Sequence, residues 1–175
     1  QIGLAIHSYE NSLGAYPLAY SPNYTGDGAE PNQLKRHNLF NFILAYLEQQ
    51  QLADRLDFTF NYDSVAVGRA GVCNRDVTQV RLNVALCPSA PLREGDDQWA
   101  ADYAACVDIY DRDWDDLVDS GLVGRRPQAA LLSMLQDSKT TPEMITDGLS
   151  NSIMLFEDAG QPHHFLHGQF EGRVA

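Results

Sequence analysis

The chain has 175 residues, 44% of them hydrophobic and 21% charged, proportions that exclude a disordered or collagen-like protein. Its 24 acidic residues outnumber its 12 basic residues, and the net charge of −12 argues against nucleic acids and anionic membranes as partners. A chain of this length buries roughly 70% of the surface that it exposes when unfolded, so we expect one domain over residues 1–175.

The first predicted element is a helix at residues 2–13. Apolar residues recur there at the spacing of one helical face: Ile2, Ile6, Tyr9 and Leu13. Gly14 follows at the position of a C-cap glycine, and Pro17 prevents the helix from continuing. The pattern is already helical at Gln1, so we expect the helix to begin upstream.

A polar segment and a second helical pattern come next. Residues 20–36 are rich in Gly, Pro, Asn and Asp and predict an exposed loop. Residues 38–56 predict a helix whose polar residues 48–51 face solvent. Its apolar stripe contains Leu39, Phe42, Ile43, Tyr46 and Leu47.

The later part of the chain predicts short strands. Apolar and polar residues alternate over residues 80–86, and weaker strand patterns occupy residues 101–110 and 152–156. Between them, Thr141 and Pro142 predict the N-cap and first position of a short helix that ends at Asp147 and Gly148. Helices come first and strands later, which favours an α+β fold.

One acidic segment resembles a calcium-binding loop. Carboxylates occupy positions one, three, five and nine of an EF-hand-type loop, at Asp111, Asp113, Asp115 and Asp119. Asp116 replaces the turn glycine, and Leu122 replaces the bidentate glutamate at position twelve. The sequence favours a solvated acidic loop or helix start over a calcium site, so we expect no cofactor unless this segment binds calcium in another geometry.

Other chemistry-bearing residues lack a complete catalytic pattern. His163, His164 and His167 could contribute to a zinc site or be ordinary hydrogen-bonding side chains. A hydrolase would pair Glu157 with Asp147 or Asp158. The serines occupy no nucleophile-elbow motif, and no activating base is evident beside Cys87, so we expect no catalytic residues and no enzyme.

The three cysteines do not define the compartment. Cys73, Cys87 and Cys106 have no paired zinc-ligand spacing, and they could be buried thiols or contribute one disulfide. If the protein is exported, we expect Cys87 to be oxidised with Cys73 or Cys106.

Four segments in fixed order resemble a large bacterial family of pseudopilin-like proteins of unknown function. The segments are QIGLAIHSYENSLGAYP, AYLEQQQLADRLDF, NRDVTQVRLNVALCPSAP and ITDGLSNSIMLFEDAGQP, and together they span most of the chain. The residues that match the family motifs are Cys87, Pro88, Ser89, Asp147, Gly148, Ser150, Asn151 and Glu157. Ala90 stands where the family's turn has an aspartate, so no role of that acid is carried over.

The resemblance implies a pilin-like fold, with an N-terminal helix, truncated here, packed on a small antiparallel sheet with long loops. It implies a precursor anchored in the inner membrane by a helix upstream of residue 1, and a domain trimmed at both ends. It also implies assembly with itself or other pilin-like subunits into an envelope or extracellular filament of the type IV pilus or type II secretion kind.

An extracytoplasmic module that binds a glycan or small solute is the second interpretation. Exposed aromatic rings could stack on sugars while the acidic surface binds their hydroxyls. The candidate rings are those of Tyr20, Tyr24, Trp99, Tyr103, Tyr110 and Trp114, which could instead anchor the core and loops.

Overall fold

The computed structural model describes residues 1–21, 35–90, 101–106, 111–122, 124, 139–146, 148–159, 163–166 and 169–173, the side chains of 111–114, 163–166 and 169–173 excepted. The α-helices are α1 (Ile2–Leu13), α2 (Leu39–Ile43), α3 (Gln50–Ala53), α4 (Asn74–Thr78) and α5 (Asp111–Asp119). The 3-10 helices are η1 (Leu44–Leu47), η2 (Asn83–Ala85), η4 (Pro142–Met144) and η5 (Leu149–Asn151). The strands are β1 (Tyr20–Ser21), β2 (His37–Asn38), β3 (Tyr103–Ala105), β4 (Leu155–Glu157), β5 (His163–Leu166) and β6 (Gln169–Arg173).

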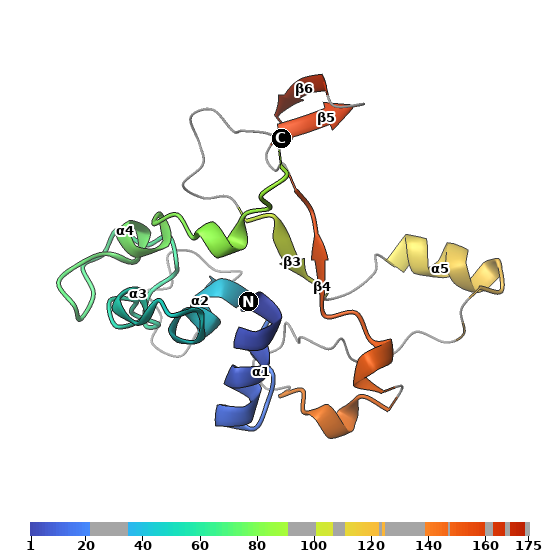
Figure 1. Cartoon of the computed structure of the whole chain (residues 1–175), viewed down its shortest axis with the longest axis horizontal. Coiled ribbons are helices and arrows are strands. Elements are labelled where there is room, and N and C mark those ends of the chain that lie inside the picture. Colours follow the sequence, from blue (N-terminus) through green and yellow to red (C-terminus); the bar gives the residue numbers. More distant parts are fainter. Residues whose placement is uncertain are drawn as a thin grey trace.

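These elements confirm the predicted α+β class. The described strands form three antiparallel pairs, β1 with β2, β3 with β4, and β5 with β6. Figure 1 shows α1 and the group α2 to α4 beside the β3–β4 pair, with α5 to one side and the β5–β6 hairpin at one end. None of the helices in the described part of the chain has the length and apolar content that crossing a membrane requires.

Helix α1 ends at Leu13 and has the C-cap glycine that the sequence predicts. Gly14 adopts a left-handed conformation with φ 71°, and its N–H donates to the Glu10 carbonyl at 2.7 Å. Ile2 and Ile6 are buried as expected, and Ala5 is buried beside them. The prediction was wrong for Leu13, which is 58% exposed because it lies in the last turn, outside the apolar cluster that the rest of this face joins.

The predicted helix at residues 38–56 is divided into α2, η1 and α3. Asn38 caps α2, since its side chain accepts from the Asn41 N–H at 3.2 Å while Asn41 accepts from the Asn38 N–H. Glu48 then adopts φ 63°, a left-handed conformation that ends η1. The chain therefore changes direction, and Leu52 packs in a second apolar cluster with Val77 of α4.

The strand predicted at residues 80–86 was wrong. Leu82, Val84 and Leu86 are half-buried, but Ala85 is only 2% exposed and Val80 is exposed, so burial does not alternate as it would in a strand. The backbone bonds are local, since the Ala85 N–H donates to the Leu82 carbonyl and the Leu86 N–H to the Asn83 carbonyl, and the segment forms η2 instead. The other two predicted strands overlap β3 and β4, which pair with Tyr103 opposite Glu157.

Within the predicted loop at residues 20–36, Ser21 and Lys35 are buried, whereas Tyr20 is exposed as expected. Ser21 and His37 form the β1–β2 pair, and both are 2% exposed. The Ser21 hydroxyl accepts the His37 N–H at 2.9 Å, which fixes the two ends together, while residues 22–34 lie outside the described residues.

A polar clamp, defined as Asp57, Asn61 and Asn74, closes the loop between α3 and α4. Asn74 is 1% exposed; its amide oxygen accepts from the Asp57 N–H at 2.8 Å, and its amide nitrogen donates to the Asp57 and Asn61 carbonyls at 2.8 and 3.0 Å. The Asp57 carboxylate accepts from the Arg69 N–H, and the adjacent Gly68 is required because a Cβ there would lie 2.9 Å from the Asp57 Cβ. The Thr59 hydroxyl, followed by the backbone N–H groups, lowers the pKa of Asp57.

His37 is buried between aromatic rings. Its ring lies 4.5 Å from that of Phe58 and 6.1 Å from that of Phe42, measured between centroids, and its Nε2 donates to the Phe60 carbonyl at 2.9 Å. Its Nδ1 is buried without a hydrogen-bond partner in the described part of the chain. Burial lowers the pKa of His37, against smaller opposing effects of the Phe60 carbonyl and Asn41.

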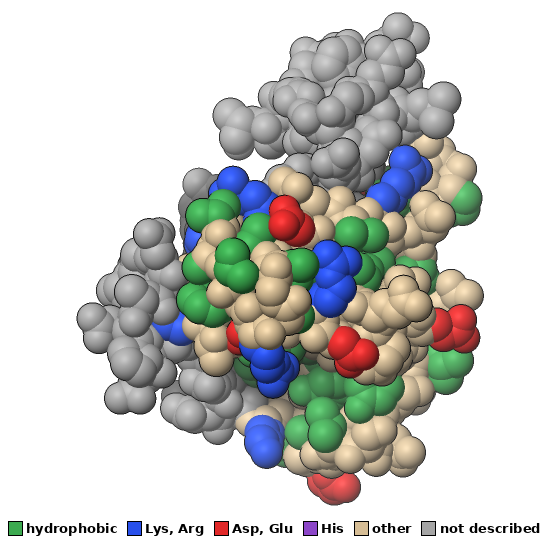
Figure 2. Space-filling view, turned by 90° about the vertical axis from the view of Figure 1, so that its left-hand side faces the viewer, with side chains coloured by type: hydrophobic (Ala, Val, Ile, Leu, Met, Phe, Trp, Pro, Cys, Tyr) green, Lys and Arg blue, Asp and Glu red, His purple; other side chains and the backbone are tan. Residues whose placement is uncertain are grey.

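Figure 2 shows the face of the molecule on the α2–α4 side. Acidic and basic side chains are interspersed on it, with apolar side chains in small groups between them. One ion pair on the described surface joins Arg36 and Asp63 at 2.8 Å. The excess of acid is therefore a property of the whole chain and is not concentrated on this face.

Candidate functional site

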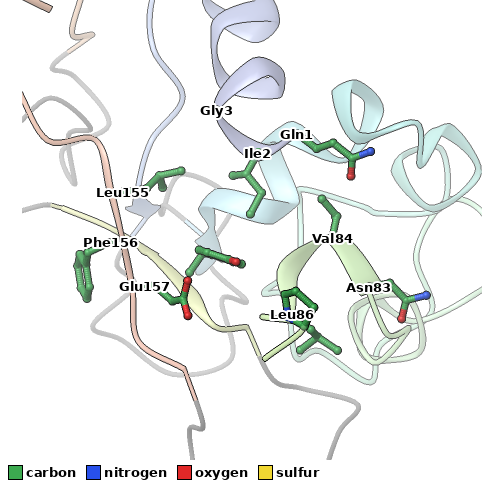
Figure 3. Close-up of a pocket in the computed structure, with 11 residues that line it drawn as sticks. Gln1, Ile2, Gly3, Asn83, Val84, Leu86, Leu155, Phe156 and Glu157 are labelled. Atoms are coloured by element: carbon green, nitrogen blue, oxygen red, sulfur yellow. The ribbon is translucent and has the colours of Figure 1, made fainter. Parts of the chain in front are cut away.

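The candidate site is an open pocket between the start of α1, the η2 region and the β3–β4 pair. Its volume is about 600 Å³, within the usual range for small-molecule sites. The lining residues are Gln1, Ile2, Gly3, Asn83, Val84, Leu86, Pro88, Tyr103, Leu155, Phe156 and Glu157. Figure 3 shows the side chains of Leu155 and Glu157 on the pocket side of β4 and that of Phe156 on the other side, as strand alternation requires.

Tyr103 and Glu157 are the polar centre of this pocket. They are directly opposite in the β3–β4 register, so their side chains leave the same face of the pair. The Tyr103 hydroxyl interacts with the Glu157 carboxyl and with the Cys87 thiol. Partial burial, followed by the adjacent Glu157 and Cys87 side chains, raises the pKa of Tyr103, which keeps its hydroxyl protonated as a hydrogen-bond donor.

Asp102 holds the turn at residues 87–90 beside this centre. Its carboxylate accepts from the Cys87 N–H at 2.7 Å, and it is only 1% exposed. The turn itself closes through a bond from the Ala90 N–H to the Cys87 carbonyl, and the Cys87 sulfur lies 3.2 Å from the Ser89 hydroxyl. Sequence reasoning missed Asp102, because nothing in the local pattern distinguishes a buried acid from the other aspartates.

The structure brings together some of the sequence-predicted motif residues. Cys87, Pro88 and Glu157, which come from two motifs about 70 residues apart, meet at or beside the pocket. Ser150 and Asn151 are instead exposed on η5, after Gly148 with φ 90°. Asp147 lies outside the described residues.

The predicted calcium segment forms helix α5 and not a ligand-wrapping loop. In an α-helix, positions 111, 115 and 119 share one face while position 113 lies on another, so the four do not surround one point as an EF-hand loop would. Among the described residues, no group of three or more His, Cys, Asp and Glu side chains is arranged to hold a metal. The side chains of Asp111 and Asp113 lie outside them, and calcium binding stays a prediction.

Several other predicted residues also lie outside the described part. These are Tyr24, Trp99, Tyr110 and His167, together with the side chains of Trp114, His163 and His164. Of the remaining aromatic candidates, Tyr20 is 37% exposed and Tyr103 lines the pocket. Of the predicted carboxylate pair, Glu157 lines the pocket, whereas Asp158 is not among its lining residues.

The cysteines are free thiols in the structure. Cys73, Cys87 and Cys106 are all half-buried. Asp102 comes just before β3 and Cys106 just after it. The bond to Asp102 therefore holds the Cys87 backbone at the start of β3, whereas Cys106 lies at the other end of the strand. Oxidation of Cys87 after export stays a prediction.

A family model matches residues 1–174, which is nearly the whole chain. The chain belongs to the family described as Protein of unknown function (DUF1559). Membership confirms the resemblance at the level of an unknown-function family. Comparisons with curated proteins and with solved structures found no match.

Proposed function

We propose that this chain is the globular part of an assembly subunit of a pilus-like or pseudopilus-like envelope filament, without enzymatic activity. The supporting observation is the way in which α1 packs on the β3–β4 pair. Ile2, Ala5 and Ile6 belong to the core cluster against which Tyr103, Ala105 and Leu155 of the β3–β4 pair pack. A helix docked on an antiparallel pair is the arrangement that the pseudopilin-like resemblance implies.

The outward face of α1 supports the same proposal. Leu4 lies about 200° around the helix from Ile2 and is 72% exposed, so it is available to a neighbouring subunit. In this proposal a membrane-inserted precursor is processed and then packs by α1 against copies of itself or other pilin-like subunits. Its functional requirement is a set of contact surfaces, and no cofactor is needed.

Electron microscopy of envelopes from cells that make the full-length protein tests the proposal. Antibody against residues 1–175 should label filaments, and Leu4→Glu should abolish incorporation without lowering the melting temperature. Val65→Glu is the matched control, because Val65 is 65% exposed on a different segment and should be tolerated. Diffuse label without filaments in the wild type would reject the filament role.

Binding of a solute is a second candidate function, favoured by the pocket. A cavity of about 600 Å³ that combines apolar walls with a tyrosine hydroxyl and a carboxylate has the composition of a small-molecule site. In this case the domain would present the pocket outside the cytoplasm. A screen of glycans and small solutes against the purified domain distinguishes the two candidates.

A further inference from the structure

Helix α5 carries an apolar stripe outside the apolar core of the described chain. Figure 1 shows the helix to one side of the β3–β4 pair, and none of its described residues belongs to either apolar cluster. Leu117 is half-buried, whereas Val118 is 41% exposed. Position 114, a tryptophan, lies on the same helical face as these two residues, since residues three and four apart are neighbours on a helix.

The end of α5 extends this stripe to Leu122. Gly121 adopts φ 73° after the helix, and its N–H donates to the Val118 carbonyl at 2.9 Å. The Leu122 N–H donates to the Leu117 carbonyl at 3.1 Å. These two bonds form the Schellman motif, which turns the residue after the glycine back toward the last turn of the helix. The motif therefore holds Leu122 on the Leu117 side of α5, although Leu122 is 74% exposed.

The carboxylates of α5 determine the charge of a suitable partner. Five of its nine residues are aspartates, against one arginine. Asp115, Asp116 and Asp119 are exposed, and the one ion pair among the described residues, Arg36 with Asp63, does not involve them. A second copy of this chain would bring a like-charged helix and a net charge of −12 to this face. Charge complementarity therefore favours a basic partner over a second copy.

We propose that α5 docks into an apolar groove of a partner protein, and that lysine or arginine side chains rim this groove. Leu117, Val118 and Leu122 would enter the groove, as apolar anchors of amphipathic helices do at spacings of three and four residues. The aspartates would pair with the basic rim, which steers the partner and selects it over neutral grooves. The inference does not rest on the filament role, because that role uses the exposed face of α1 and not α5.

An NMR titration of the 175-residue chain with a synthetic peptide tests the proposal. The probe is a helix-forming peptide of leucine and lysine, with the leucines on one face and the lysines beside them. We expect a Kd on the order of 10 μM, with shift changes concentrated on residues 111–122. A scrambled peptide of the same composition has the same charge but no apolar face, and should bind at least about tenfold more weakly. Equal binding of the two peptides would show that charge alone acts, and would overturn the proposal.

Truncation of the apolar stripe locates the site. Val118→Ala combined with Leu122→Ala should weaken binding of the peptide roughly tenfold. Alanine has the higher helix propensity at position 118, so unfolding of α5 would not account for this loss. Leu149→Ala truncates a leucine that is 46% exposed on η5, and this matched control should leave the affinity unchanged. Unchanged affinity in the double variant would reject the site.

Charge variants and sedimentation test the nature of the partner. Asp115→Asn combined with Asp119→Asn should weaken binding at low salt, whereas Asp76→Asn, which neutralises an exposed aspartate of α4, should not. Equal effects of the two would contradict pairing at α5. The chain alone should sediment as a monomer at a concentration on the order of 100 μM. A dimer that Val118→Ala with Leu122→Ala dissociates would assign the stripe to a second copy and overturn the proposal.

Discussion

Asp102 and Cys87 are joined by a 2.7 Å hydrogen bond from the Cys87 N–H to the Asp102 carboxylate. Asp102 also donates its own N–H to the Ala85 carbonyl and accepts the Asp158 N–H at its carbonyl, both at 2.8 Å. One buried residue therefore connects the η2 region, the start of β3 and the chain after β4. The position of the pocket depends on this connection, because residues of the η2 region, β3 and β4 form its walls together with the start of α1.

Removing the Asp102 carboxylate should destabilise the protein. We expect Asp102→Ala to lower the free energy of unfolding by about 2 kcal/mol, because it leaves the half-buried Cys87 N–H without its charged acceptor. Asp102→Asn, which keeps an acceptor oxygen, should cost less. Urea denaturation measures both values, and equal losses in the two variants would show that the charge, and not the acceptor, is what matters.

The polar clamp predicts a similar cost for Asn74. Asn74→Ala should lower the free energy of unfolding by about 3 kcal/mol, since it leaves the Asp57 N–H and the Asp57 and Asn61 carbonyls without their partner in a buried site. Asn83→Ala is the control, because Asn83 is exposed and should change stability by less than about 0.5 kcal/mol. Chemical denaturation monitored by circular dichroism gives the free energy of unfolding of both variants. Similar losses of stability in the two would contradict a stabilising role of the clamp.

Acidification should destabilise the folded state through His37. Burial lowers its pKa below the usual value of about 6.5, so below that pH the unfolded state takes up a proton that the folded state resists. The free energy of unfolding should fall as the pH drops from about 6.5 through the lowered pKa of the folded state, and level off below it. His37→Gln removes this contribution, so its stability curve between pH 7 and 5 should be flatter than that of the wild type. Parallel curves would show that His37 does not titrate differently on folding.

Two glycines of the first helix should respond in opposite directions. Gly14 has φ 71°, so Gly14→Ala should lower the free energy of unfolding by about 1 kcal/mol. Gly3 is helical with no atom within 4 Å of an added Cβ, and Gly3→Ala should raise stability by up to about 1 kcal/mol. Thermal denaturation of both variants tests the cap, and stabilisation by Gly14→Ala would contradict it.

Local signals predicted some elements well. The helical face of α1 followed from the spacing of Ile2 and Ile6 and its end from Gly14, because a helix face and its cap are encoded by adjacent residues. The division after η1 was not predictable, since Glu48 adopts a left-handed conformation that its residue type disfavours. Alternation of residue types around Val84 misled the strand prediction, because the segment has no pairing strand and closes on itself through local bonds in η2.

The candidate site was only partly predictable. Motif resemblance selected Cys87 and Glu157, but their meeting at Tyr103 depends on the β3–β4 register, which joins segments about 50 residues apart. The supporting polar residues Asp102 and Asn74 were not identified, because their burial results from tertiary contacts between loops. In sequence they resemble ordinary surface residues.

The polar clamp has a consequence for the order in which the protein opens. The bonds of Asp57 and Asn74 stay within residues 57–74, whereas Arg36 and His37 bond to residues 60–63 and join β2 to the segment. The α4 end of the segment packs on the cluster of Leu52 and Val77, separate from the cluster that holds α1. The segment is thus a candidate cooperative unit in native-state hydrogen exchange, whose amides, including those of Asp57 and Arg69, exchange together in one opening event while α1 stays folded.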